Sequence, residues 1–297
     1  MASITAFDSK DFKRSNRTGD LKFFSPLGCG ITVSKPEEFQ KCYIEKLNQL
    51  FQDFNISPMC GCFASSEYFP SAGRPKTFKL ADELLKSVQK YIDSVFISYV
   101  VLPSKLIPTV EVRKYKEPKR EVKTLDFLRE LSSAFSYITA FTYCNRNRGK
   151  SEKIFIDGFR GKLTNTWTNF VDTVTPVVYP RGDECNVYIS TADMIASLTD
   201  KKIYDNHLRL TEEDIKEVWK DYSFDVDVRF LDSKILPHIT EISNDLIDAT
   251  RYHAKPTIFL KADDYPIAEI QKLSVYSEAT LLARDLNGCL QGFDKKN

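Results

Sequence analysis

The chain has 297 residues, of which 42% are hydrophobic and 28% charged, a composition typical of globular proteins and not of disordered ones. Its 42 lysines and arginines nearly balance 41 aspartates and glutamates, so net charge points to no class of partner. No stretch reaches the roughly 18 apolar residues of a membrane helix, and the polar start does not resemble a secretory signal. Seven scattered cysteines favour reduced thiols over a disulfide framework. We therefore expect a cytoplasmic protein with no membrane contact.

The first half of the chain alternates strand and helix patterns. The expected strands span residues 3–7, 21–24, 28–33 and 95–101. One helix is expected to begin with Ser34 as N-cap and to run through Phe51, and a second to span residues 80–92. Between residues 103 and 123 the chain becomes basic and contains Pro118, which is typical of an exposed loop or an edge hairpin.

The second half repeats this alternation. A long amphipathic helix is expected over residues 125–143, then strands ending at Asp157, at 174–179 and at 186–189, and a helix over 191–198. Beyond about Tyr222 the pattern starts afresh, with strands at 224–231 and 257–260 and helices at 236–249 and 268–284. The predicted organisation is a domain over 1–221 and a C-terminal α/β region or elaboration over 222–297.

Three aspartates occupy positions that matter for the architecture. Asp8 ends the first predicted strand, Asp157 ends a later one, and Asp193 opens a predicted helix directly after a strand. Strand ends and adjoining helix starts meet at one crevice in α/β sheets, so these acids can converge. Converging carboxylates repel one another unless a cation neutralises them, and hard oxygen ligands suit Mg²⁺ or Mn²⁺. The alternative is that each acid forms a turn or caps a helix.

Short motifs in the same order resemble a known family. The segment Tyr188–Leu198 (YISTADMIASL) is similar to the "LQLADLIA" motif that closes the domain in the DUF3800 family of ribonuclease-H-like proteins. Phe7-Asp8-Ser9 resembles the family's first strand, and Ile154-Phe155-Ile156-Asp157 its later strand of the form "IIID". The resemblance covers roughly residues 1–205. It implies an α/β fold with a ribonuclease-H-like mixed sheet flanked by helices.

The resemblance also implies an activity, metal-dependent hydrolysis of phosphodiester bonds in DNA or RNA. Asp8, Asp157 and Asp193 would be the catalytic, metal-binding residues. Apart from the resemblance, Asp183-Glu184 offers extra acids, of which Glu184 is the expected further ligand of Mg²⁺ or Mn²⁺. The family has Asp-Glu where this chain has Asp8-Ser9. The alternative is therefore a catalytically degenerate protein that acts as a nucleic-acid-binding or complex-forming subunit, with the C-terminal region as a docking surface for a protein partner.

Clusters of basic residues fit a polyanionic ligand, because lysine and arginine hold phosphate backbones. One cluster lies around Pro118 and another flanks the Asp157 strand. The expected nucleic-acid-binding residues are Arg113, Lys114, Lys116, Lys119, Arg120, Arg146, Arg148, Lys150, Arg160 and Lys162. An ordinary charged surface is the alternative interpretation.

Overall fold

The structure, a computed structural model, describes the greater part of the first 231 residues and one strand beyond them. The described residues are 3–15, 21–103, 109–113, 120–122, 135–137, 139–140, 142–144, 147, 152–157, 177–179, 181–231 and 257–261. Of the helices in this part of the chain, none is both long and apolar enough to cross a membrane.

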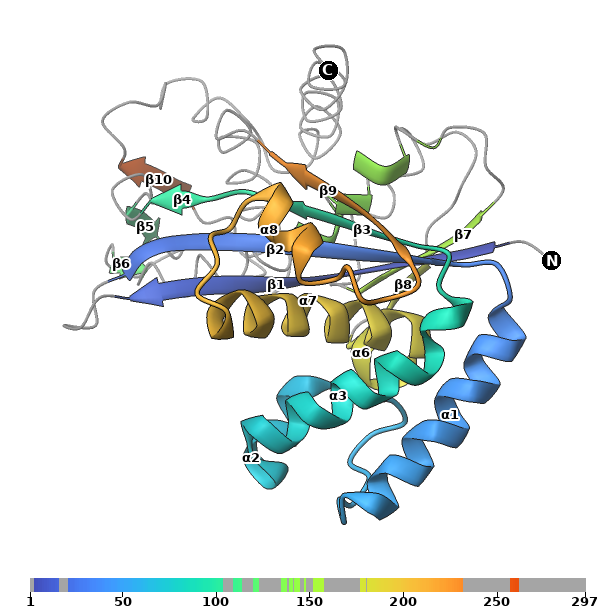
Figure 1. The fold of residues 1–297 in the computed structure, drawn as a ribbon. Helices are drawn as coiled ribbons and strands as arrows, with labels where there is room; N and C mark the ends of the chain where they lie inside the picture. Colours follow the sequence, from blue (N-terminus) through green and yellow to red (C-terminus); the bar gives the residue numbers. More distant parts are fainter. Residues whose placement is uncertain are drawn as a thin grey trace.

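A mixed sheet of seven strands organises the described part of the chain (Figure 1). Six of its strands lie in the order β8-β7-β1-β2-β3-β9, and β4 pairs with β2. Strand β2 runs antiparallel to both of its neighbours, β1 and β3, whereas β7 runs parallel to β1, β8 to β7, and β9 to β3. Their bounds are β1 (Ser3–Ser15), β2 (Leu21–Val33), β3 (Ser94–Tyr99), β4 (Leu102–Pro103), β7 (Glu152–Asp157), β8 (Val177–Tyr179) and β9 (Asp225–Phe230).

The basic segment around Pro118 contributes to a second, three-stranded sheet. Its strands are β5 (Thr109–Arg113), β6 (Arg120–Val122) and β10 (Thr257–Lys261), and β5 pairs antiparallel with the other two. The expected hairpin is therefore present as β5–β6. The edge position expected for it is wrong for β5, because β10 covers its other side.

One face of the main sheet is covered by helices in two layers. Helix α7 contacts β1, β2 and β7, and α1, α2 and α3 pack on α7 from the other side (Figure 1). The helices are α1 (Pro36–Asp53), α2 (Ser65–Ala72), α3 (Arg74–Val88), which continues into a 3-10 turn (Gln89–Tyr91), α6 (Gly182–Cys185), α7 (Val187–Asp205) and α8 (Glu212–Glu217). This layering leaves α7 between the sheet and the outer helices.

Strand alternation assigns the side chains of β1 to the two faces of the sheet. Phe7 points away from α7 and lies edge-on to Tyr143, one of the helical residues 142–144, with ring centroids 5.5 Å apart. Asp8 and Lys10, one residue and three residues further along, therefore belong to the α7 face. The register pairs Asp8 with Cys29 of β2, which is fully buried on that same face.

Four local predictions are wrong, each for a physical reason. The strand of Asp8 does not end there, because residues 9–15 continue to pair with β2 and place Asp8 in mid-strand. The first helix is capped at Lys35, since the Ser34 hydroxyl instead donates to Asp93 (2.8 Å). The segments predicted at 21–24 and 28–33 form one strand, β2. The predicted strand at 186–189 is the start of α7, so Asp193 lies in the second turn of its helix.

Other predictions are confirmed or lie outside the described residues. Strands ending at Asp157 and over 225–230 and 257–261 match their predicted positions. Strand β9 joins the main sheet beside β3, so this part of the predicted C-terminal region extends the sheet of β1. The predicted helices at 236–249 and 268–284 lie outside the described residues, and the division at 221/222 stays a prediction.

Candidate active site

Helix α7 is buried along its first thirteen residues, from Val187 to Thr199. Asn186 begins it by accepting hydrogen bonds from the backbone N–H of Tyr188 (3.0 Å) and Ile189 (3.2 Å). Inside this stretch, the Ser190 hydroxyl donates to the carbonyl of Phe63 (2.6 Å) and the Thr191 hydroxyl to the carbonyl of Val187 (2.7 Å). A helix buried on all sides tolerates few charges, so the single charged residue of this stretch, Asp193, needs an explanation.

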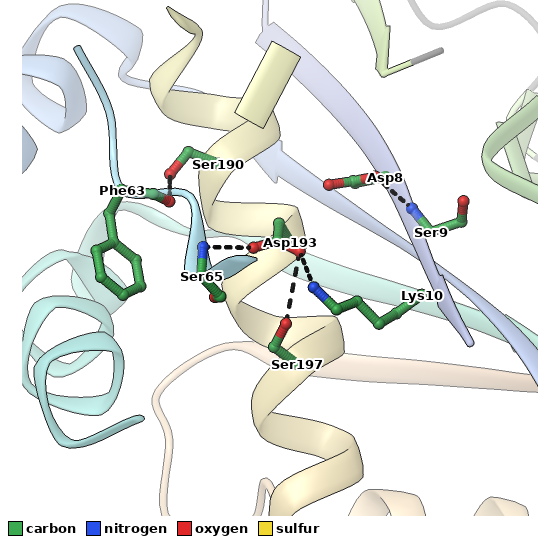
Figure 2. Close-up of polar contacts among 8 residues, drawn as sticks. All are labelled: Asp8, Ser9, Lys10, Phe63, Ser65, Ser190, Asp193 and Ser197. Atoms are coloured by element: carbon green, nitrogen blue, oxygen red, sulfur yellow. Dashed lines mark hydrogen bonds and ion pairs between the residues drawn. The ribbon is translucent and has the colours of Figure 1, made fainter. Parts of the chain in front are cut away.

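Asp193 is held from three directions (Figure 2). The Lys10 ammonium lies 2.9 Å from its Oδ1, and the Ser197 hydroxyl donates to the same oxygen at 3.5 Å. Its Oδ2 accepts a bond from the backbone N–H of Ser65, the first residue of α2, at 3.3 Å. The residue is only 3% exposed. Strand β1 and helices α2 and α7 therefore meet at this carboxylate.

Asp8 and Asp157 lie on neighbouring parallel strands. The register pairs Phe7 with Ile156, so the next residue on each strand, Asp8 and Asp157, lie side by side on the α7 face. Asp8 accepts a 2.6 Å bond from the Ser9 N–H and is 6% exposed. Asp157 accepts a 2.6 Å bond from the N–H of Gly182, which ties α6 to the end of β7.

The pKa values of Asp8 and Asp183 are shifted by the charges of the neighbouring acids. Burial raises the pKa of Asp8 well above its ordinary value, and the charges of Asp157, Asp193 and Asp183 raise it further, while Lys10 opposes them. Burial, followed by Asp193, Asp157 and Glu184, raises the pKa of Asp183 on α6 to about 7. Four aspartates from β1, β7, α6 and α7 thus form one acidic cluster: Asp8, Asp157, Asp183 and Asp193.

Lys10 is the cation of this acidic cluster. Burial lowers its pKa, but the charge and hydrogen bond of Asp193 and the charges of Asp8 and Asp183 outweigh burial, and the net shift is upward. The lysine is therefore fully charged at neutral pH. One ammonium faces up to four carboxylates, so the cluster carries an excess of negative charge that a further cation would relieve.

The donor chemistry of the acidic cluster fits a hard divalent ion, since its ligands would all be carboxylate oxygens. As the side chains stand, the described residues contain no group of three or more His, Cys, Asp or Glu placed to hold a metal ion. Lys10 already occupies an oxygen of Asp193. A metal ion at Asp193 Oδ1 would have to displace this ammonium.

The remaining predicted site residues are placed less centrally. Glu184 forms an ion pair with Arg181 and acts on Asp183, but it is not among the charges that shift Asp8. Arg113 and Arg120 lie on β5 and β6, where only the backbone is described. The other predicted nucleic-acid-binding residues lie outside the described part of the chain: Lys114, Lys116, Lys119, Arg146, Arg148, Lys150, Arg160 and Lys162.

Sequence reasoning missed Lys10 and Ser65 as members of the site, and it chose Glu184 over the adjacent Asp183. Lys10 follows Asp8 at the two-residue spacing that shares a strand face, and this signal was present in the sequence. Ser65 has no such signal, because its position depends on how α2 packs on α7. Asp183 is adjacent to Glu184, and the choice between the two depends on the direction of a four-residue helix.

Fold and site together define a mixed α/β protein with a buried cluster of carboxylates and one lysine. The chain belongs to the family described as "Domain of unknown function (DUF8203)", whose match spans residues 5–250 and includes all four aspartates and Lys10. It is similar to an uncharacterized protein of Archaeoglobus fulgidus, at 25% identity over 264 residues that cover 86% of this chain and 76% of the relative.

The family match corrects the predicted membership in DUF3800, which is wrong. A strand followed by an acid recurs in many α/β proteins, because aspartate is a common turn residue and ligands bind at strand ends. Three short motifs of this kind do not outweigh a match along most of the chain.

Proposed function

We propose that this protein is a divalent-metal-dependent phosphodiesterase acting on DNA or RNA. The observation that carries the proposal is the acidic cluster, in which four aspartates from four different elements meet in a largely buried place. Buried carboxylates repel one another and destabilise the fold, so a site that gathers four of them favours a functional role over a structural one.

The residues of the acidic cluster divide into two roles in this proposal. Asp8, Asp157 and Asp193 would bind Mg²⁺ or Mn²⁺, which when bound would activate water and stabilise the leaving oxygen of a phosphodiester. Asp183, with its pKa raised to about 7, is about half protonated at neutral pH. A carboxyl group of that pKa is suited to exchange a proton with the attacking water or the leaving oxygen.

The strand order supports a finer proposal about the fold. Three antiparallel strands, β3-β2-β1, continue into two parallel ones, β7 and β8, and a helix after the last strand carries an acid onto the sheet. We infer from this order that the sheet follows a ribonuclease-H-like plan, in which Asp8, Asp157 and Asp193 would converge from β1, β7 and α7. Strand β9 and the insertion α1–α3 would be additions to that plan. A cytoplasmic location fits the free thiols of Cys29, Cys42, Cys60, Cys62 and Cys185.

A second candidate function has an observation of its own. The Lys10–Asp193 ion pair already supplies a cation inside the acidic cluster. A protein that keeps this pair permanently would bind nucleic acid or a protein partner without cleaving anything. The two candidates differ in whether metal reaches Asp193.

A cleavage assay tests the proposed activity. Labelled single- and double-stranded DNA and RNA are incubated with the full chain and Mn²⁺ or Mg²⁺, and wild type is compared with Asp8→Asn, Asp193→Asn and the control Asp205→Asn. Asp205 is on the same helix as Asp193 but pairs with Lys201 outside the acidic cluster. We expect both cluster variants to lose roughly 100-fold or more in rate and the control to keep its activity. Equal activity in all four proteins would refute the site, and salt-sensitive binding without cleavage would favour the second candidate.

A further inference from the structure

Lys10 reaches the acidic cluster from the same face of β1 as Asp8. Figure 2 shows both side chains extending from the strand toward Asp193 on α7. The Lys10 ammonium lies 2.9 Å from Asp193 Oδ1, and the Lys10 side chain is 28% exposed whereas that of Asp193 is 4% exposed. One end of this ion pair is therefore fixed in the core, and the other belongs to a long side chain with access to solvent.

A second feature beside Asp193 indicates that the site takes a ligand. The Ser65 hydroxyl is buried, with its residue 1% exposed, and it lacks a hydrogen-bond partner among the described residues. Its own backbone N–H donates to Asp193 Oδ2 at 3.3 Å, so Ser65 lies beside the carboxylate. Buried hydroxyls almost always find a partner, and leaving one without costs about 1–3 kcal/mol. An oxygen-rich ligand shell at Asp193, such as that of a hydrated metal ion, would supply the missing bond.

We propose that Lys10 is an internal cation that competes with a divalent metal ion for Asp193. In the metal-free protein the lysine offsets the repulsion within the acidic cluster and keeps α7 and β1 together. A metal ion at Asp193 Oδ1 repels the ammonium at close range, and the partly exposed Lys10 side chain turns away from α7. Its charge is then free to hold a phosphate oxygen of the nucleic acid, so metal and substrate are bound in sequence. This inference rests on the proposed function for the identity of the ligand.

Manganese binding measures the competition without any nucleic acid. The full-length chain, freed of metal, is titrated with MnCl₂ by calorimetry in wild type, Lys10→Met and the control Lys201→Met, whose lysine pairs with Asp205 outside the acidic cluster. We expect Lys10→Met to bind Mn²⁺ about tenfold more tightly or better, because a competing charge has been removed, and Lys201→Met to match wild type. Unchanged or weaker binding in Lys10→Met overturns the proposal, as does the absence of binding in every variant.

A second variant guards against misfolding. If Lys10→Met does not fold, Lys10→Gln keeps a hydrogen-bond donor for Asp193 without the charge and should show the same gain in manganese affinity. Cleavage is measured separately, so the two proposals fail independently. A protein that gains manganese affinity on losing Lys10 but cuts no nucleic acid supports the role of Lys10 and refutes the nuclease.

Discussion

Asp183 illustrates how a single residue can connect stability with function. Burial and the neighbouring Asp193 and Asp157 raise its pKa from 3.8 to about 7. The folded state therefore holds this proton more tightly than the unfolded state does. The stability that Asp183 contributes is fully present below about pH 4 and is lost as the pH rises through about 7. Above that pH, an ionised Asp183 destabilises the folded protein.

Replacing Asp183 by asparagine should therefore stabilise the protein, but only where the aspartate is ionised. We expect Asp183→Asn to raise the melting temperature more at pH 8 than at pH 4.5, because the amide removes a charge and keeps the shape. Thermal unfolding followed by circular dichroism, without metal, measures the difference. The control is Asp205→Asn, which removes an exposed charge that pairs with Lys201. An equal or lower melting temperature of Asp183→Asn at pH 8 would contradict the arrangement of charges.

At the level of single residues, the sequence was informative about acids and uninformative about their partners. Asp8, Asp157 and Asp193 were singled out from two predicted strand ends and a predicted helix start, of which the structure has only the strand end at Asp157. Their roles in catalysis and metal binding stay predictions. The contacts of Asp193 with Lys10 and Ser65 join residues 183 and 128 positions apart. Such contacts depend on tertiary packing, which no local pattern encodes.

Among the elements, β2 shows why its glycines matter. Gly28 faces the helical residues Phe135 and Thr139. A Cβ added at Gly28 would lie 1.7 Å from Thr139 Oγ1 and 3.1 Å from the carbonyl of Phe135. The Thr139 hydroxyl bonds both Ser98 of β3 and the Phe135 carbonyl, so it cannot move aside without cost. Helix and sheet can approach this closely only because residue 28 has no side chain.

The substitution Gly28→Ala tests this packing. We expect it to destabilise the fold by roughly 1–3 kcal/mol, the usual cost of overpacking, measured by urea unfolding. Gly61→Ala is the matched control, since the nearest atom to its added Cβ is 3.5 Å away, an ordinary contact distance. If both variants unfold at the same urea concentration, the helical segment at Phe135 and Thr139 does not pack against β2 as the structure has it.

Helices and strands were predicted correctly where a short stretch of sequence shows a clear hydrophobic pattern. They were predicted wrongly where burial on all sides removes that pattern. Strands β3, β7, β9 and β10 have short apolar runs bounded by turn residues, which mark strands clearly. The start of α7 reads as a strand because a helix buried on all sides shows no 3.6-residue pattern. The predicted strand end at Asp8 failed because a long hairpin partner extends β1, and pairing between distant strands is not visible in either strand alone.

On the scale of the whole molecule, the site depends on how distant segments are assembled. Residues 8 and 10 come from the first strand, 157 from β7, and 183 and 193 from the segment that follows β8. The family match over residues 5–250 takes in all of these segments, so the family shares the part of the chain that builds the site. Mixed α/β architecture could be predicted from composition and alternation, whereas the family could not be identified from short motifs.

The acidic cluster should bind a metal ion. A crystal structure with manganese tests this binding most directly. Crystals of the full chain are soaked in MnCl₂ and the ion is located by anomalous scattering. We predict an anomalous peak roughly 2.1 Å from carboxylate oxygens of Asp8 and Asp193, with Lys10 turned away from α7. No peak at this position under saturating manganese, with Lys10 still paired to Asp193, would contradict the account.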